Sequence, residues 1–322
     1  MAKRLILWVG ILFSAFCLYW AFRGISFRDT LNALKEARPV FLLLALCIYA
    51  LGYWMRAVRW ETLLEPIKHV PAKTLFCPLI IGFFGNNVLP LRMGEFLRAH
   101  LAGKKLEISR TSCLATIFME RLYDTISFLL TFLAVTLFFP FPSAIKKGAY
   151  ALGLACCLTL VGLVLSIVYK SYAENILAKL PLPHALKEKL QHLFTNFIHG
   201  VSGTTRPLHV CKAFFQSLII WTLEGTTLYT IVHAFPVPFA YAQSFFLLFM
   251  LGLAVLLPQA PGYVGTLELA GVTALGLGGI GKAEALPIIL TIHALQFSFI
   301  LVLGFFSLSN EGLTFSQLFN TK

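Results

Sequence analysis

The sequence predicts an all-α polytopic membrane protein with about six complete spans and two broken helical hairpins. The first observation behind this prediction is composition: 58% of the residues are hydrophobic and 12% are charged, whereas a soluble domain has roughly 25% charged residues. The second is arrangement, because the apolar residues form long runs separated by short basic loops. A spanning helix needs ~20 apolar residues, since hydrocarbon offers no water to satisfy backbone groups. A soluble fold is therefore excluded.

Six apolar runs are long enough for complete spans. The first begins after Lys3 and Arg4, as a signal sequence would, but Trp20 and Phe22 replace the small residues of a cleavage site. We therefore predict that this run remains as a membrane anchor. The predicted spans are 5–22, 40–58, 112–139, 149–169, 213–235 and 285–307.

Two further apolar stretches, 77–101 and 241–280, are interrupted by Gly, Asn and Pro. In the first, Asn86 and Asn87 precede Pro90, and proline suits a first helical position. Each stretch is expected to form two short helices that enter and leave the membrane on the same side. The arms of the second stretch, 241–257 and 262–280, are long enough to cross fully, which would give the chain up to eight spans.

Two segments, 28–38 and 184–203, have apolar residues on one face and polar residues on the other, which predicts surface helices. In the shorter one, Leu31 and Leu34 are expected to face inward. Residues 1–140 then read span, surface helix, span, hairpin and span, and residues 141–322 repeat that order. Because each half has three complete spans, the two halves have opposite orientations. This is the inverted repeat common among secondary transporters.

The net charge is +12, from 26 basic and 14 acidic residues. Its distribution among the loops is expected to set the orientation of the chain in the membrane and to favour contact with anionic lipid. The basic residues lie in loops, so nucleic acid is not an expected partner. If both termini are cytoplasmic, 16 Lys and Arg residues lie inside and seven outside, as the positive-inside rule favours. We expect a bacterial-type inner (cytoplasmic) membrane. The seven cysteines lack metal or disulfide spacing, and no metal or cofactor is expected.

Charged side chains at membrane depth are costly and usually functional, and here they concentrate around the two breaks. Helices that begin after Pro90 and Pro261 would direct their positive ends at one centre, which suits an anionic group. The alternative is that the arginines and carboxylates only lock helices together, with Glu224 as a packing group. The predicted substrate-binding residues are Asn86, Asn87, Arg92, Glu95, Arg98, Glu120, Arg121, Asp124, Gln259, Gly262, Gly265 and Glu268. The predicted proton carriers are Glu95, Glu120, Asp124, Glu224 and Glu268.

Three motifs carry a family resemblance: G-F-F-G-N-N-V-L-P-L-R-M-G-E-F-L-R at 82–98, M-E-R-L-Y-D at 119–124 and P-G-Y-V-G-T-L-E at 261–268. With them the chain resembles the lysylphosphatidylglycerol synthase transmembrane region family, also called flippase-like membrane proteins. The resemblance implies movement of an anionic or amphiphilic lipid between leaflets. In the synthases a large cytosolic domain performs aminoacyl transfer, whereas about fifteen residues follow the last predicted span here. We expect a stand-alone member without that activity. The matching positions are Asn87, Pro90, Arg92, Gly94, Glu95, Arg98, Glu120, Arg121, Asp124, Pro261, Gly262, Gly265 and Glu268.

The resulting hypothesis is a lipid translocase that holds an anionic headgroup in a central polar cavity between the two hairpins. No P-loop motif is present, so gradients, protons or mass action would drive the movement. One alternative is an intramembrane enzyme acting on lipid phosphates or lipid-linked sugars. Another is a non-transporting partner of a lipid-modifying enzyme. The expected partners are membrane lipids, with a homo-oligomer or a lipid-biosynthesis enzyme as further partners to consider.

Overall fold

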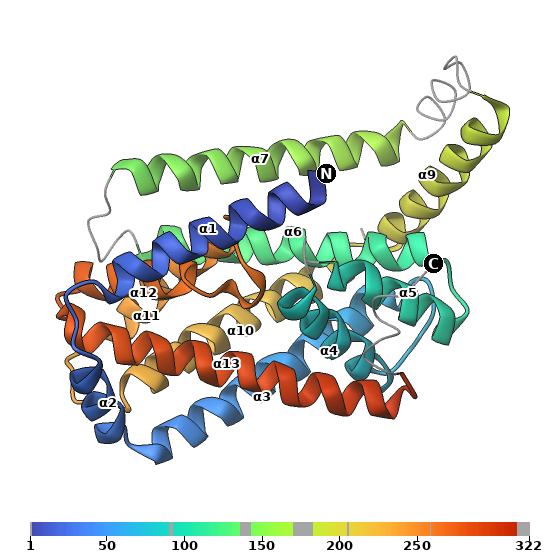
Figure 1. Cartoon of the computed structure of the whole chain (residues 1–322). Coiled ribbons are helices and arrows are strands. Elements are labelled where there is room, and N and C mark those ends of the chain that lie inside the picture. Colours follow the sequence, from blue (N-terminus) through green and yellow to red (C-terminus); the bar gives the residue numbers. More distant parts are fainter. Residues whose placement is uncertain are drawn as a thin grey trace.

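The computed structural model of the chain describes residues 2–89, 93–135, 143–169, 183–204, 206–257 and 259–313. In these ranges the regular structure is entirely helical, as predicted, and the helices form one elongated bundle (Figure 1). The helices of residues 1–140 are α1 (Ala2–Phe22), α2 (Phe27–Glu36), α3 (Pro39–Leu64), α4 (Ala72–Val88), α5 (Gly94–Leu106) and α6 (Arg110–Val135). Those of residues 141–322 are α7 (Ser143–Val168), α9 (His184–Thr204), α10 (Pro207–Val232), α11 (Tyr241–Val255), the 3-10 turn η2 (Pro261–Tyr263), α12 (Thr266–Leu277) and α13 (Lys282–Asn310).

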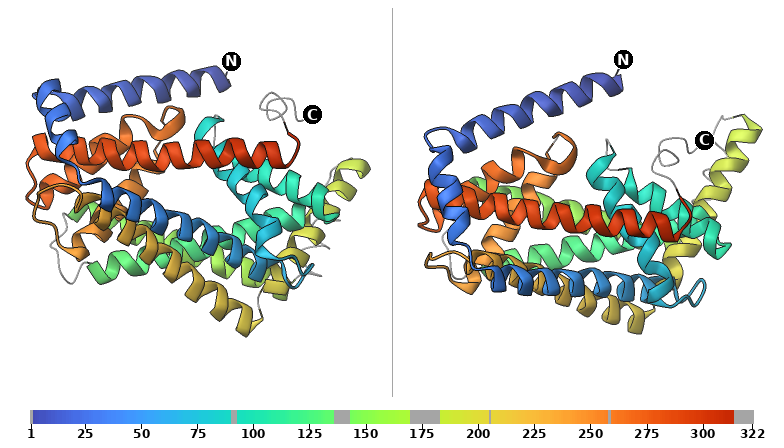
Figure 2. Two further views of the ribbon diagram at one scale, coloured as in Figure 1. Left: turned by 90° about the horizontal axis from the view of Figure 1, so that it is seen from below. Right: turned by 60° about the horizontal axis from the view of Figure 1, so that its bottom comes forward.

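Each predicted span coincides with a helix, namely α1, α3, α6, α7, α10 and α13, but several bounds differ. Helix α3 continues to Leu64, six residues past the predicted end, and α10 begins earlier, at Pro207. Among the described residues, α3 and α13 meet a length and hydropathy criterion for crossing a membrane, with mean hydropathy of 1.8 and 2.2 over 18 residues. Both run along most of the bundle (Figure 2).

The first hairpin consists of α4 and α5, which pack side by side and separate at the predicted break. Their open ends are tied together, because Lys68 Nζ donates to the carbonyl oxygen of Leu106 over 2.8 Å. Near the tip the two backbones approach so closely that a Cβ atom on Gly94 would lie 1.9 Å from the carbonyl oxygen of Gly82. Asn86 Oδ1 accepts a hydrogen bond of 2.9 Å from the backbone N–H of Gly94, at the start of α5.

The second hairpin consists of α11 and α12, joined through η2. Its open end is tied by Gln243 Nε2, which donates to the carbonyl oxygen of Gly278 over 3.0 Å. At its tip, three residues have left-handed backbone: Gly262 with φ 77°, Tyr263 with φ 62° and Gly265 with φ 93°. Glycine adopts such angles readily, whereas tyrosine rarely does. The tip is therefore held in an uncommon conformation by its surroundings.

The two hairpins open at opposite ends of the bundle. Lys105 Nζ at the end of α5 lies 2.5 Å from a carboxylate oxygen of Glu311, which follows α13. At the other end, the N–H of Arg38 before α3 donates over 2.9 Å to the carbonyl oxygen of Ala234, between α10 and α11. The arms of 17, 13, 15 and 12 residues are roughly 18–26 Å long at 1.5 Å per residue, shorter than the ~30 Å hydrocarbon core.

Most of the other contacts between helices link the two halves of the chain. Helix α3 packs along α10, α2 packs on α13, and α9 packs on α6. Helix α1 lies at the edge of the bundle against α12, and α7 lies against α6 and α9 (Figures 1 and 2). On α2 the prediction for Leu31 is wrong, because its side chain is 42% exposed. Its neighbour Thr30 is buried instead, and Leu34 packs against the core as predicted.

Replacing Gly94 by alanine is expected to destabilise the first hairpin, because the added Cβ would overlap the carbonyl oxygen of Gly82. Overpacking of this kind costs about 1–3 kcal/mol, and thermal unfolding of the purified protein in detergent measures it. Gly276→Ala on α12 is the matched control, since nothing lies within 4 Å of its Cβ position. A helical Gly→Ala change there stabilises by up to about 1 kcal/mol. Equal unfolding temperatures for the two variants would contradict the close approach.

Candidate functional site

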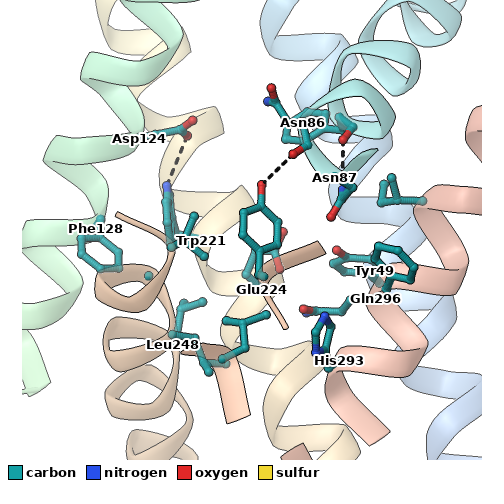
Figure 3. Close-up of a pocket in the computed structure, with 18 of the residues that line it drawn as sticks. Tyr49, Asn86, Asn87, Asp124, Phe128, Trp221, Glu224, Leu248, His293 and Gln296 are labelled. Carbon is teal, nitrogen blue, oxygen red and sulfur yellow. Dashed lines mark hydrogen bonds between the residues drawn. The ribbon is translucent and has the colours of Figure 1, made fainter. Parts of the chain in front are cut away.

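A cavity of about 740 Å³ lies between the two hairpin tips, within the size range of ligand pockets. Its wall draws on α3, α4, α5, α6, α10, α11, η2, α12 and α13, so nearly the whole bundle contributes. Figure 3 shows Asn86 and Asn87 across the cavity from Asp124 and Trp221. Residues far apart in the sequence thus converge on one space.

The cavity wall has a polar part and an apolar part. Amide, carboxylate and guanidinium groups come mainly from the first hairpin, α3, α6 and α10, and the apolar side chains come mainly from α11 and α13. The charged and amide groups that line it are Arg56, Asn86, Asn87, Glu95, Arg121, Asp124, Glu224 and Gln296. The aliphatic groups are Leu228, Leu248, Leu251, Val255, Leu256, Leu267, Ile289, Ile292 and Ile300. This division suits a ligand with one polar and one apolar portion.

Arg121 and Glu95 form the most accessible ion pair of the site. Arg121 Nε lies 3.2 Å from Glu95 Oε1, and each side chain is 33% exposed. The same guanidinium lies 2.7 Å from an oxygen of Glu120 and 3.2 Å from an oxygen of Asp124. Three carboxylates thus surround one arginine, and Glu95 is the most exposed of the three.

A second ion pair joins α3 to α10 in the same wall. Arg56 Nη2 lies 2.5 Å from Glu224 Oε1. The guanidinium carbons of Arg56 and Arg121 lie 5.5 Å and 5.8 Å from the ring centroid of Phe83, within the range of cation–π contacts. Phe83 therefore contacts both cationic groups of the cavity wall.

Two further arginines lie behind the wall, fully buried. Arg59 bonds both oxygens of Asp124, at 2.5 Å and 3.2 Å. Arg98 bonds both oxygens of Glu120 at 3.0 Å, and its guanidinium carbon lies 3.6 Å from the centroid of Trp60. Buried ions of this kind are stable only when paired and hydrogen-bonded. These pairs lock α3, α5 and α6 together.

At the second hairpin tip, Glu268 accepts a hydrogen bond of 2.6 Å from the backbone N–H of Gly265. His293 on α13 lines the cavity and contacts this tip at two points. Its Nδ1 atom lies 2.5 Å from Glu268 Oε1, and its Nε2 atom lies 2.7 Å from the carbonyl oxygen of Gly262. Gln259 also belongs to the tip, where its side chain bonds Thr266 and the carbonyl oxygen of Val255.

The predicted site residues that the structure describes therefore fall into three groups. Six of them line the cavity: Asn86, Asn87, Glu95, Arg121, Asp124 and Glu224. Arg98 and Glu120 lie behind its wall, while Gln259, Gly262, Gly265 and Glu268 form the second tip. Arg92 and Pro90 lie outside the described residues. One backbone N–H at the start of each inner helix is already bonded: that of Gly94 by Asn86, and that of Gly265, which precedes α12, by Glu268.

Sequence reasoning missed Arg56 and Arg59, which the charge count placed on the cytoplasmic side, one just before and one just after the end of the predicted span 40–58. Both are buried, because α3 continues past them. Their spacing of three residues, with the aromatic Trp60 next in the chain, was a signal that the helix continues with a polar face. Among the described residues, no group of three His, Cys, Asp or Glu side chains could hold a metal ion.

Comparison with known proteins places this architecture among membrane proteins. The family described as "Lysylphosphatidylglycerol synthase TM region" matches residues 7–304. A UPF0104 membrane protein of Methanothermobacter thermautotrophicus is 26% identical over 264 residues, which cover 72% of this chain and 75% of that protein. Another, from Methanocaldococcus jannaschii, is 24% identical, covering 69% and 91%. Glycosyltransferase AglD of Haloferax volcanii is 23% identical, covering 91% of this chain and 52% of AglD.

Replacing Glu120 by glutamine is expected to destabilise the protein by about 3–5 kcal/mol, because it leaves buried Arg98 without its charged partner. Glu95→Gln makes the same chemical change in a side chain that is 33% exposed, where the expected cost is under about 1 kcal/mol. Thermal unfolding in detergent compares the two variants. A larger loss for Glu95→Gln would mean that the buried network is not what holds α5 to α6.

Proposed function

The chain belongs to the lysylphosphatidylglycerol synthase transmembrane region family of membrane proteins, and we propose on that basis that it moves a lipid with an anionic headgroup between membrane leaflets. The observation that carries the proposal is the two-part cavity between hairpins that open at opposite ends of the bundle. A headgroup in the polar part, with acyl chains along the apolar part, would match its chemistry. Movement between leaflets would require the cavity to open to each side of the membrane in turn.

The arrangement of the halves supports the inverted repeat on which this proposal depends. In the first half, α2 and α4 both pack on α13, the last helix of the second half. In the second half, their equivalents α9 and α11 both pack on α6, the last helix of the first half. Helix α3 packs on α10, its equivalent in the other half. Inverted halves that meet at a central site are the plan of many transporters. With cytoplasmic termini, as the charge distribution favours, the first hairpin opens to the cytoplasm and the second to the outside.

The headgroup is proposed to bind by exchange at Arg121. Both arginines that line the cavity, among the described residues, already face carboxylates. A phosphate would therefore displace Glu95, the partner that is most accessible from the cavity. Arginine binds phosphate through two parallel hydrogen bonds, which fits this role. The remaining carboxylates at Arg121, Glu120 and Asp124, stay bound to Arg98 and Arg59 behind the wall.

The similarity to about half of Glycosyltransferase AglD favours a second candidate function. In that case the bundle would hold a lipid-linked sugar for an enzyme, or act on it, without moving it across the membrane. Mass spectrometry of lipids before and after incubation with the protein separates these functions. A chemically altered lipid would support an enzyme, whereas an unaltered lipid in the opposite leaflet would support translocation.

Arg121→Gln is expected to slow the movement of fluorescent anionic lipid in proteoliposomes by at least about tenfold, the scale of one lost charge-assisted hydrogen bond. Under the exchange proposal, Glu95→Gln should retain or increase the rate, because a competitor of the phosphate is removed. Leaflet-specific quenching of the fluorophore measures the rate, with anionic and zwitterionic lipids compared.

Arg110→Gln is the matched control for charge, since Arg110 is exposed at the start of α6 and does not line the cavity. Its rate should equal that of the wild type. Movement that is indifferent to Arg121 would refute the proposed binding site. The absence of movement for every lipid tested would refute translocation and leave the lipid-holding function.

A further inference from the structure

The contact between α13 and the second hairpin tip has a chemistry that the other ion pairs of the cavity lack. His293 reaches two acceptors at once, the carbonyl oxygen of Gly262 at 2.7 Å and Glu268 Oε1 at 2.5 Å. Glu268 in turn binds the N–H of Gly265 through its other oxygen, at 2.6 Å. The chain of contacts therefore spans the three residues with positive φ, from Gly262 in η2 to Gly265 just before α12.

Counting hydrogens shows that this arrangement needs a proton that it can lose. A carbonyl oxygen only accepts, so Nε2 of His293 carries a hydrogen and donates it to Gly262. The contact of Nδ1 with Glu268 needs a second proton, held by either partner. When one proton leaves, a neutral imidazole has one N–H for two acceptors. Because Glu268 is then the charged acceptor, the remaining N–H stays with it, and Gly262 is released.

The other four carboxylates that the sequence singles out as proton carriers have partners of a different kind. Each of them faces at least one arginine, and a guanidinium keeps its proton under all ordinary conditions. Those pairs remain charged. Histidine, by contrast, exchanges its proton near neutral pH. Of the five, Glu268 is the one whose partner can change charge.

Release of Gly262 would act on the next residue, Tyr263. Its φ of 62° is rare for a residue with a side chain, and its hydroxyl donates to the carbonyl oxygen of Asn86 over 3.4 Å. That bond joins the tip of the second hairpin to the tip of the first, in the cavity wall. With Gly262 free, the backbone at Tyr263 can relax, and the contact between the two tips opens.

We propose that His293 and Glu268 form a proton-binding site, and that loss of its proton releases the second hairpin tip from the first. Low pH then holds the tips together, and high pH separates them. The inference rests on the proposed lipid movement, because the tip that moves carries part of the cavity wall. It identifies the coupling ion as a proton and, of the five predicted proton carriers, assigns that proton to Glu268 together with His293.

Other charged and titratable groups lie on the elements that pack against α12 or α13. Arg56 on α3 pairs with Glu224 on α10. The hydroxyl groups of Tyr49 and Tyr53 on α3 lie 3.3 Å apart. The remaining groups on these elements, among the described residues, are Cys17 and Tyr19 on α1, Arg28, Lys35 and Glu36 on α2, Cys47, Arg59 and Glu61 on α3, Lys73 and Cys77 on α4, His209, Cys211, Lys212 and Tyr229 on α10 with His233 at its end, Tyr241 on α11, and Lys282 and Glu284 on α13.

Hydrogen exchange of the full chain in proteoliposomes tests the proposal, through the backbone protection of residues 259–268 between about pH 5 and about pH 9. After correction for the intrinsic pH dependence of exchange, opening of this segment should rise on the order of tenfold as pH increases, the scale of one lost hydrogen bond to a charged group. Glu268→Gln should abolish this pH-dependent step in opening. The segment should stay protected in this variant, because the glutamine amide donates to neutral His293. His293→Phe should be open at every pH.

His233→Gln is the matched control, since His233 lies at the end of α10 and bonds the carbonyl oxygen of Tyr229. It should retain the wild-type step. A wild type without a step, or a step that survives Glu268→Gln, would overturn the proposal. Lipid movement in the same vesicles separates the two claims. If exchange depends on pH, Glu268→Gln abolishes that dependence and the vesicles move no lipid, the proton site is supported and translocation is refuted. If the vesicles move lipid but exchange does not depend on pH, translocation is supported and the proton site is refuted.

Discussion

Four arginines at the centre of an apolar bundle impose the constraint on which the rest of the structure depends. A guanidinium does not lose its proton, so Arg56, Arg59, Arg98 and Arg121 must each meet a carboxylate in surroundings of low dielectric. Their partners lie on other helices and join α3 to α6 and α10, and α5 to α6. Helices that met only through apolar faces could slide along one another. Bidentate arginine–carboxylate pairs instead fix the position, or register, of each helix along its neighbour. The cavity is the space that this register leaves between the hairpin tips.

The helices and both hairpins could be predicted from sequence because the signals for them are local. Long apolar runs predict the spans, and the interruptions at 86–90 and 258–265 predict where the hairpins turn. The structure has helix ends on either side of both interruptions. The side chains of Asn86, Asn87 and Arg121 could likewise be assigned to one site, since polar groups in an apolar run are costly unless they share a polar space.

The partners of the charged residues could not be predicted, because pairing depends on packing between distant segments. Arg59 lies 65 positions before Asp124, and Arg56 lies 168 positions before Glu224. The predicted second span ends at 58, between Arg56 and Arg59. Helix α3 nevertheless continues to Leu64, because those arginines are neutralised inside the bundle. At the start of each inner helix, one backbone N–H that was expected to be free is bonded by a side chain, that of Gly94 by Asn86 and that of Gly265 by Glu268.

The pairing of Arg56 with Glu224 has a consequence for biosynthesis. Glu224 follows Arg56 by 168 residues, which a ribosome adds in roughly 10–30 seconds at 5–20 residues per second. During that interval the newly made first half carries a buried cation whose partner does not yet exist. An unpaired charge at membrane depth costs a few kcal/mol or more. Helix α3 must therefore wait beside water or beside the insertion machinery until α10 arrives, and the two halves complete their folding as one unit.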